Sequence, residues 1–176
     1  MNNEKKVNAG IIRLVREDIT LLEIEAFVYY ARPDLQLGSG IGSAIAIRGG
    51  PSIQEELKTF KPIQVGESVV TAGGKLKAKF IIHAVGPRFQ EEKLEDKLRA
   101  TLLSALKIAE EKKVEKLAIP PLGVGFYGVP LDVSATITVE TLRNHFKKNG
   151  KLKEAVICVF DSRQFKTFQS QLEAKA

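Results

Sequence analysis

Apolar and polar residues follow one another in blocks that predict strands and helices in turn. Short runs that are apolar almost throughout predict strands buried on both faces. Longer segments with apolar residues every three or four positions predict amphipathic helices. The expected strands are 10–15, 24–30, 66–71, 79–85, 117–119 and 155–160, and the expected helices are 43–48, 51–60, 91–113, a helix from Val133 to Phe146, and a last one after Asp161.

This alternation predicts an α/β fold, a three-layer α/β/α sandwich with a central mixed, mostly parallel sheet. The turn Gly73-Gly74 between two of the strands predicts an antiparallel hairpin. Local signals mark three helix ends. Ser52 with Glu55 predicts a capping box, Gly150 predicts a C-cap, and Asp161-Ser162 predicts an N-cap.

Length and composition predict one domain over residues 1–176. The chain has 176 residues, of which 44% are hydrophobic, enough for one well-buried core. It contains no run of about 18 apolar residues that could span a membrane, and its first ten residues lack the apolar stretch of a signal peptide. A cytoplasmic location without membrane contact is therefore expected.

The charge balance favours anionic partners. Lys and Arg together number 27 against 21 Asp and Glu, and the pI is about 9.4. This excess does not separate a nucleotide from a nucleic acid as the partner. Much of the excess lies in scattered lysines on predicted helix faces, a pattern typical of helix surfaces exposed to solvent: Lys112, Lys113, Lys147 and Lys148.

Neither a metal nor a cofactor is predicted. Cys158 lies in the apolar run AVICVF, which indicates a core residue rather than a nucleophile or a ligand. His83 and His145 fall in different elements without the spacing of metal ligands. Because His83 lies in an apolar strand with no acid nearby, a buried, hydrogen-bonded histidine is favoured over a catalytic base.

Two glycine-rich loops are the strongest functional signals. Each follows a strand, where consecutive backbone N–H groups can wrap a phosphate at little steric cost. The alternative is that the glycines are plain turn residues and that Phe126 and Tyr127 pack into the core. Since ligands bind at the carboxyl ends of strands in such sheets, the convergence of both loops there favours a binding site. The glycines are Gly38, Gly40, Gly42, Gly123, Gly125 and Gly128.

Asp18, an acidic residue with a short side chain, follows the first predicted strand. Its role has two interpretations, which the sequence leaves open. It can hydrogen-bond within its own turn, beside Thr20, or it can accept a hydrogen bond from a ligand amine.

The succession of motifs resembles a macrodomain over almost the whole chain. It begins with Asp18-Ile19-Thr20, followed by an apolar strand and a Gly-x-Gly-x-Gly loop. It continues with IIHAVGP at 81–87, IPPLGVGFYGVP at 119–130 and VFD at 159–161. The resemblance implies binding of ADP-ribose, and some family members hydrolyse ADP-ribosyl esters or related derivatives.

The resemblance also implies a role for particular residues. Asp18 would bond the adenine amino group, Ile19 would offer its backbone beside the ring, and Phe160 would pack against adenine. The two loops would enclose the diphosphate and the distal ribose through backbone amides, using Gly40, Ile41, Gly42, Gly123, Val124, Gly125, Phe126 and Tyr127.

Three departures from the family pattern change the expected activity. Hydrolases of the family typically have Asn-Ala-Ala-Asn where this chain has Tyr29-Tyr30-Ala31-Arg32, and one subgroup has an acid at the position of Gly42. Glu17 stands where the family usually has glycine, so the adenine end is altered. Arg32 can donate to ribose hydroxyls or to a phosphate, but it stays protonated and cannot be a general base.

Three functions remain as hypotheses, with the catalytic residues unknown. The first is a non-catalytic module that binds ADP-ribose, an ADP-ribosylated molecule or a related nucleotide. The second is an ADP-ribosyl hydrolase acting on O-acetyl-ADP-ribose or ADP-ribosylated protein, with the ligand's own phosphate ordering the water. The third, not favoured, is a nucleic-acid-binding module that uses the basic surface, with a steep salt dependence.

Overall fold

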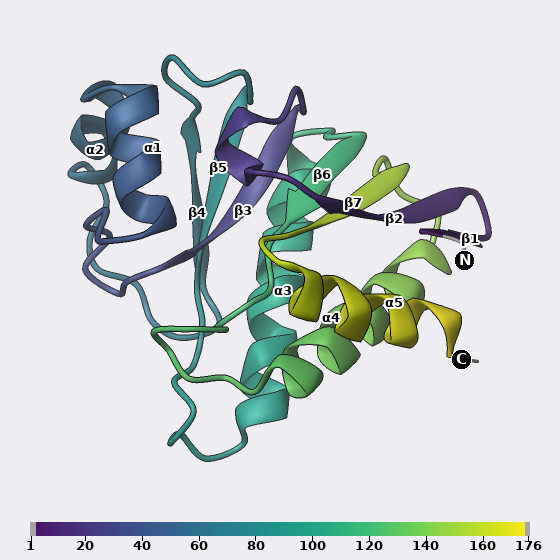
Figure 1. Ribbon diagram of the computed structural model, residues 1–176. Helices are drawn as coiled ribbons and strands as arrows, with labels where there is room; N and C mark the ends of the chain where they lie inside the picture. Colours follow the sequence, from purple (N-terminus) through teal and green to yellow (C-terminus); the bar gives the residue numbers. More distant parts are fainter. Residues whose placement is uncertain (1–2, 175–176) are drawn as a thin grey trace.

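A seven-stranded mixed sheet runs through the centre of the molecule (Figure 1), in a computed structural model that describes residues 3–174. The strand order is β1-β2-β7-β6-β3-β5-β4. Neighbours from β2 to β5 in this order are parallel, and the edge strands β1 and β4 are antiparallel to their partners. The strands are β1 Glu4–Val7, β2 Gly10–Arg16, β3 Ala26–Ala31, β4 Ser68–Ala72, β5 Phe80–Val85, β6 Lys116–Ile119 and β7 Glu154–Val159.

Helices cover both faces of this sheet, which confirms the predicted three-layer α/β/α sandwich. One face carries α3 Leu94–Glu111, α4 Leu131–Phe146 and α5 Ser162–Glu173. The other face carries α1 Ile41–Gly49, α2 Ser52–Leu57 and the short 3₁₀ helix η1 Ile19–Leu21 (Figure 1). Within residues 3–174 no helix combines the length and the apolar character needed to cross a bilayer.

The central strands are buried on both faces, as their continuous apolar runs predict. Every residue of β3 is buried, and successive side chains point to opposite faces of the sheet. Tyr29 therefore belongs to the apolar cluster beneath α1 and α2, whereas Tyr30 belongs to the cluster beneath α3, α4 and α5. Two adjacent residues thus support opposite layers of the fold.

The predicted hairpin and one helix cap are confirmed. β4 and β5 are antiparallel, and Gly73 lies so close to the carbonyl of Ala78 that a Cβ atom would overlap it. The Asp161 side chain accepts a hydrogen bond of 2.8 Å from the backbone N–H of Gln164 and so begins α5. Strand β1 was not predicted, because a charged edge strand of sequence EKKV has no apolar run to reveal it.

The two other predicted helix ends are wrong. Helix α2 has Pro51 as its N-cap, and because proline has no side-chain acceptor, no side chain caps this end of the helix. Helix α4 ends at Phe146, before Gly150, whose backbone is not left-handed. Instead, the missing Cβ of Gly150 leaves room for the Glu110 carboxylate, which accepts hydrogen bonds from the backbone N–H groups of Lys151 and Leu152.

Candidate functional site

A cavity of about 640 Å³ opens at the carboxyl ends of β3 and β6. These strands are neighbours, but their connections diverge: β3 leads to α1 on one face, and β6 leads to α4 on the other. Such a divergence leaves a crevice at the sheet edge, the usual place for a ligand in an α/β sheet. Its volume lies within the range of small-molecule sites.

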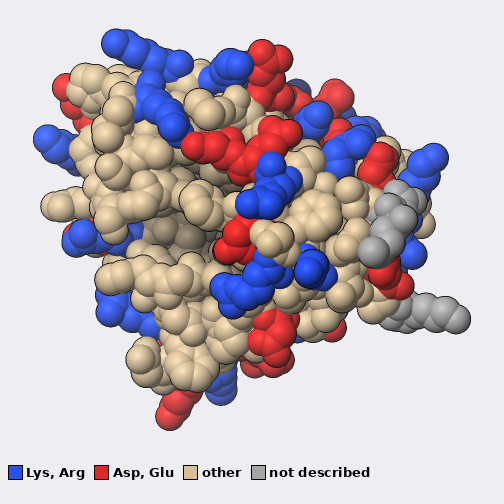
Figure 2. Space-filling model, in the orientation of Figure 1, with Lys and Arg blue, Asp and Glu red and all other residues tan. Residues whose placement is uncertain are grey.

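Three connections line the cavity: β3–α1, β5–α3 and β6–α4. Figure 2 shows its mouth as a hollow surrounded mainly by uncharged side chains. Of the predicted ligand-binding residues, the cavity brings together Arg32, Gly40, Ile41, Gly123, Val124, Phe126 and Tyr127. The other lining residues are Tyr29, Tyr30, Pro33, Asp34, Gly38, Ser39, Arg88, Pro120 and Pro121.

The first glycine loop ends at the N-terminus of α1, which borders the cavity. Gly40 is the N-cap, and no side chain caps the helix. Its φ of 63° is a left-handed conformation that glycine adopts without strain. Because the first amides of a helix have no intrahelical partner, this end offers N–H donors and a positive dipole to an anion.

Gly42, in the first turn of α1, does not line the cavity but packs against Tyr29. A Cβ atom at Gly42 would lie 2.4 Å from the Tyr29 hydroxyl oxygen, so any larger residue would collide with it. Tyr29 is itself buried, beneath this loop. The tyrosine at position 29 and the glycine at position 42 are therefore a matched pair in the packing.

The second glycine loop is held by backbone hydrogen bonds. Val129 N–H donates to the Gly123 carbonyl at 3.0 Å, and Phe89 N–H donates to the Tyr127 carbonyl at 3.0 Å. Gly123, Gly125 and Gly128 all have positive φ, at 74°, 94° and 75°. The loop does not open directly into a helix, because α4 begins only at Leu131.

Aromatic rings support this second loop. Tyr30 donates its hydroxyl hydrogen to the Pro87 carbonyl at 2.5 Å, and its ring packs edge-on against Tyr127 at 4.8 Å. Burial raises the pKa of Tyr30 well above its ordinary value, so the group stays neutral. Phe126 packs edge-on against Tyr127 but is 81% exposed, at the tip of the loop.

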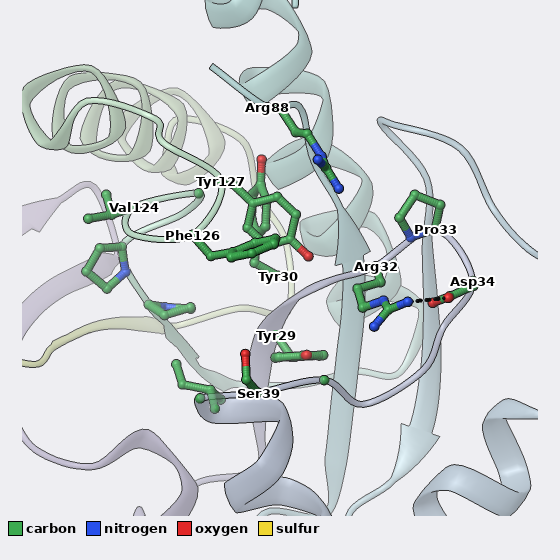
Figure 3. Close-up of a pocket in the computed structure, with 16 residues that line it drawn as sticks. Tyr29, Tyr30, Arg32, Pro33, Asp34, Ser39, Arg88, Val124, Phe126 and Tyr127 are labelled. Carbon is green, nitrogen blue, oxygen red and sulfur yellow. Dashed lines mark hydrogen bonds and ion pairs between the residues drawn. The ribbon is translucent and has the colours of Figure 1, made fainter. Parts of the chain in front are cut away.

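Charged side chains gather at one end of the cavity. Arg32 Nη2 pairs with Asp34 Oδ2 at 2.7 Å (Figure 3). The Arg88 guanidinium lies 5.9 Å from the ring of Phe126 and 6.0 Å from that of Tyr127, within the range of cation–π contact. Arg32 was singled out from the sequence, whereas Asp34 and Arg88 were not.

Three predicted residues lie outside the cavity, at the carboxyl ends of β2 and β7. These strands are neighbours, with Arg16 opposite Val159, so Asp18 and Ile19 follow one strand while Phe160 follows the other. Phe160 is 79% exposed, whereas Ile19 is buried. Gly125 also lies outside the lining and has open space around it.

Asp18 is engaged within its own turn and with α1. Its Oδ1 accepts hydrogen bonds from Thr20 N–H at 2.9 Å and Thr20 Oγ1 at 2.7 Å, and its Oδ2 pairs with Arg48 Nη1 at 2.6 Å. Partial burial raises the pKa of Asp18, but the hydrogen bonds from Thr20 and Arg48 outweigh burial and lower it. The carboxylate is therefore ionised, and its Oδ2 can still accept a further donor.

Comparison with known proteins identifies the family. The family profile described as Macro domain matches residues 31–138, which include both glycine loops and the start of α4. The chain belongs to the macro domain family. Among its relatives, a Saccharolobus solfataricus protein is 39% identical over 163 residues, 90% of each chain. A macro domain-containing protein of Caldanaerobacter subterraneus subsp. tengcongensis is 32% identical over 168 residues, 92% of this chain and 95% of its own.

Solved macrodomains share the fold over nearly the whole chain. The Oceanobacillus iheyensis macrodomain, solved with ADP, superposes with a TM-score of 0.91 at 26% identity, covering 97% of this chain and 94% of the other. The Trypanosoma brucei macrodomain, solved with ADP-ribose, superposes with a TM-score of 0.85 at 29% identity, covering 90% of this chain and 68% of the other.

Other candidate groups of this macro domain are structural. His83 is 1% exposed, and its Nε2 lies 3.0 Å from Thr71 Oγ1. Burial lowers the pKa of His83 to about 3 and raises the pKa of Cys158 to about 12, so the former is neutral and the latter a thiol. Among residues 3–174 no group of His, Cys, Asp and Glu could hold a metal ion.

The cavity residues missed in the sequence of this macro domain had only weak signals. Tyr29 and Tyr30 lie within an apolar strand, where they look like core residues, and they do belong to the core. Arg88 directly follows Gly86-Pro87, the end of a motif that carried the family resemblance. A positively charged residue just beyond a strand's carboxyl end was the available signal for Arg88.

Proposed function

We propose that this protein binds ADP-ribose or a related nucleotide diphosphate in the cavity, without hydrolysing ADP-ribosylated molecules. The observation that carries the proposal is the uncapped N-terminus of α1, which faces the glycine loop 123–128 across the cavity. Both borders offer backbone N–H groups, the donors that suit a diphosphate. The solved macrodomains with ADP and ADP-ribose, which share this fold, support the same class of ligand.

The adenosine half of the ligand would extend toward β2 and β7. Neighbouring strands lie about 4.8 Å apart, so the β2–β7 junction is roughly 10 Å from the β6–β3 junction. That separation suits a nucleoside attached to the diphosphate. Phe160 offers an exposed aromatic face to the base, and Asp18 offers its Oδ2 to the exocyclic amine.

The absence of catalysis is inferred from the charged groups of the cavity. Among the described residues that line it, Asp34 is the only carboxylate, and it pairs with Arg32. A general base must accept a proton from water, but the Arg32 guanidinium is already protonated, and the Gly42 position has no side chain. Binding would therefore proceed without turnover.

A calorimetric titration with ADP-ribose tests this proposal, with AMP and ADP as comparisons. We expect saturable binding of ADP-ribose that is clearly tighter than that of AMP. Incubation with ADP-ribosylated protein should release ADP-ribose no faster than buffer does. Absence of heat at millimolar ADP-ribose, at two temperatures, would contradict binding, and release above the buffer rate would contradict the non-catalytic assignment.

Gly40→Glu is the variant that localises the diphosphate. Gly40 lines the cavity, and nothing lies within 4 Å of the position that a Cβ atom would occupy there, so a glutamate meets no clash and brings negative charge to the helix N-terminus, although the φ of 63° strains any residue other than glycine. Gly40→Ala carries the same backbone strain without the charge, so its affinity for ADP-ribose is the reference for Gly40→Glu. We expect at least about tenfold weaker binding of ADP-ribose, because the introduced carboxylate would repel the diphosphate at the N-terminus of α1.

Lys148→Gln is the matched control for net charge. Lys148 is exposed and precedes β7, so it lies at the amino ends of the parallel strands, opposite to the cavity at their carboxyl ends. It changes the net charge by the same amount as Gly40→Glu. Equal affinity losses in both variants would show that the effect comes from net charge and not from the helix N-terminus.

A further inference from the structure

The end of the cavity nearest β5 gathers three polar side chains from three separate connections. Arg32 follows β3, Arg88 follows β5, and Tyr127 lies in the loop after β6. Figure 3 shows both guanidinium groups and the Tyr127 hydroxyl at this same end. Burial raises the pKa of Tyr127, the positive charges of Arg88 and Arg32 oppose that increase, and the Asp34 carboxylate adds to it. We call Arg32, Arg88 and Tyr127 the arginine end of the cavity.

The two arginines have donors to spare. Among the described residues, Arg32 donates only its Nη2, to Asp34, and that pair is about half exposed. Within residues 3–174, the Arg88 side chain makes no hydrogen bond or ion pair, although Glu91 lies nearby and pairs with Lys97. Because a guanidinium carries five N–H donors in a planar fork, both groups can still bind an oxyanion.

Arg88 is also held in position. Its guanidinium lies against the rings of Phe126 and Tyr127, and its own backbone N–H donates to Glu91 Oε2 at 2.6 Å. A charged group that is already held near one position loses less conformational freedom when an anion binds. Arg88 is exposed to solvent, but its contacts with the two rings hold its guanidinium at the mouth of the cavity, where an anion can reach it.

The order of the strands gives the arginine end its place along the ligand. From β2 to β5 the order is β2-β7-β6-β3-β5. A ligand that runs along this edge meets Asp18 and Phe160 first, then the two glycine loops, and then the arginine end. The arginine end therefore faces whatever is attached to the diphosphate on the side away from the nucleoside.

We propose that the arginine end binds a third anionic group, a phosphate, attached beyond the diphosphate. The inference rests on the proposed function, because it requires the diphosphate to lie between the two glycine loops. The site then favours a nucleotide with a terminal phosphate over one that ends in a neutral sugar. Asp34 moderates this preference, since its carboxylate already neutralises part of the Arg32 charge.

Titrations with ADP, ADP-ribose and ATP, all with EDTA, test the preference directly. We expect ATP to bind about tenfold more tightly than ADP, and ADP-ribose to bind more weakly than ATP. Inorganic tripolyphosphate and pyrophosphate form a second arm without a base. Tripolyphosphate should bind more tightly than pyrophosphate, which would assign the gain to the third phosphate alone.

Variants of the arginine end separate its role from general charge. Arg88→Gln and Arg32→Gln should each reduce the ATP-to-ADP affinity ratio severalfold. Asp34→Asn should raise the ratio, because it keeps the hydrogen-bond acceptor for Gln36 N–H while releasing Arg32. Lys148→Gln removes a positive charge at the amino ends of the strands, away from the cavity. It should leave the ATP-to-ADP affinity ratio unchanged.

Each outcome decides between the inference and the function on which it rests. Tight ADP-ribose binding with equal affinities for ATP and ADP overturns the third-phosphate site and leaves the proposed function standing. A higher affinity for ATP that survives both arginine substitutions also overturns it, because the phosphate is then bound elsewhere. Failure of every nucleotide to bind refutes the proposed function, and the inference falls with it.

Discussion

The two glycine loops look alike in the sequence but use their glycines for different physical reasons. Of the glycines in the first loop, only Gly40 has a positive φ, while Gly42 is needed because the Tyr29 hydroxyl occupies the space of a side chain. In the second loop, Gly123, Gly125 and Gly128 all have positive φ. Spacing alone therefore does not reveal why a glycine is present.

Each loop also rests on its own tyrosine. Tyr29 supports the first loop from the α1 side of the sheet, and Tyr30 supports the second from the α4 side. Because these residues are adjacent in β3, one strand positions both borders of the cavity. The adjacent tyrosines at positions 29 and 30 therefore support both loops at once.

The largest effect on stability is expected for Gly123→Ala. Its φ of 74° would strain alanine, and its Cβ would lie 2.5 Å from Val129 Cγ2. Strain and overpacking together should lower the free energy of unfolding by about 3–4 kcal/mol. Gly125→Ala is the matched control, because its φ of 94° is also positive but nothing lies within 4 Å.

Gly125→Ala should cost only about 1 kcal/mol, the contribution of the backbone alone. Urea denaturation of both variants measures the difference. Equal losses would mean that Val129 moves aside freely, and that the second loop depends on backbone conformation only.

A smaller loss is expected for Gly42→Ala, and it should depend on Tyr29. Overpacking against the hydroxyl should cost about 2 kcal/mol. In a Tyr29→Phe background the nearest remaining ring atom is Cζ, at 3.2 Å, so the same substitution should cost less than about 1 kcal/mol. A double-mutant cycle by urea denaturation measures this coupling, and strictly additive losses would show that Tyr29 and Gly42 are not a matched pair.

Sequence patterns predicted the parts of this molecule that depend on local chemistry. The buried strands, the hairpin at Gly73 and the Asp161 cap follow from apolar runs and turn residues close in the chain. The pairing of Asp18 with Arg48 joins residues 30 positions apart, and Arg88 meets Phe126 only after the strands are assembled. Such contacts depend on tertiary geometry, which leaves no periodic signal along the chain.

A last prediction distinguishes the supports of the two loops by their response to acid. Tyr29 packs edge-on against His83 at 5.8 Å, whereas Tyr30 contacts Tyr127 and the Pro87 carbonyl. Thr71 Oγ1 donates to the Ala72 carbonyl, so His83 Nε2 donates to Thr71, and Nδ1 has no partner among the described residues. His83 is thus a neutral group beneath the first loop only.

Burial lowers the pKa of folded His83 to about 3. Between pH 3 and about 6.5 the His83 side chain therefore binds a proton in the unfolded chain but not in the folded one. The stability that neutral His83 provides is complete above pH 6.5 and is lost as the pH falls through this window, by about 1.4 kcal/mol per pH unit below pH 5.5.

Urea denaturation at pH 7.0, 5.5 and 4.5 should therefore show a steeper loss for the wild type than for His83→Gln. Tyr30→Phe should keep the wild-type slope, since Tyr30 stays neutral throughout. Parallel slopes for the wild type and His83→Gln would mean that His83 is protonated in the folded state, and the contrast between the two supports would then fail.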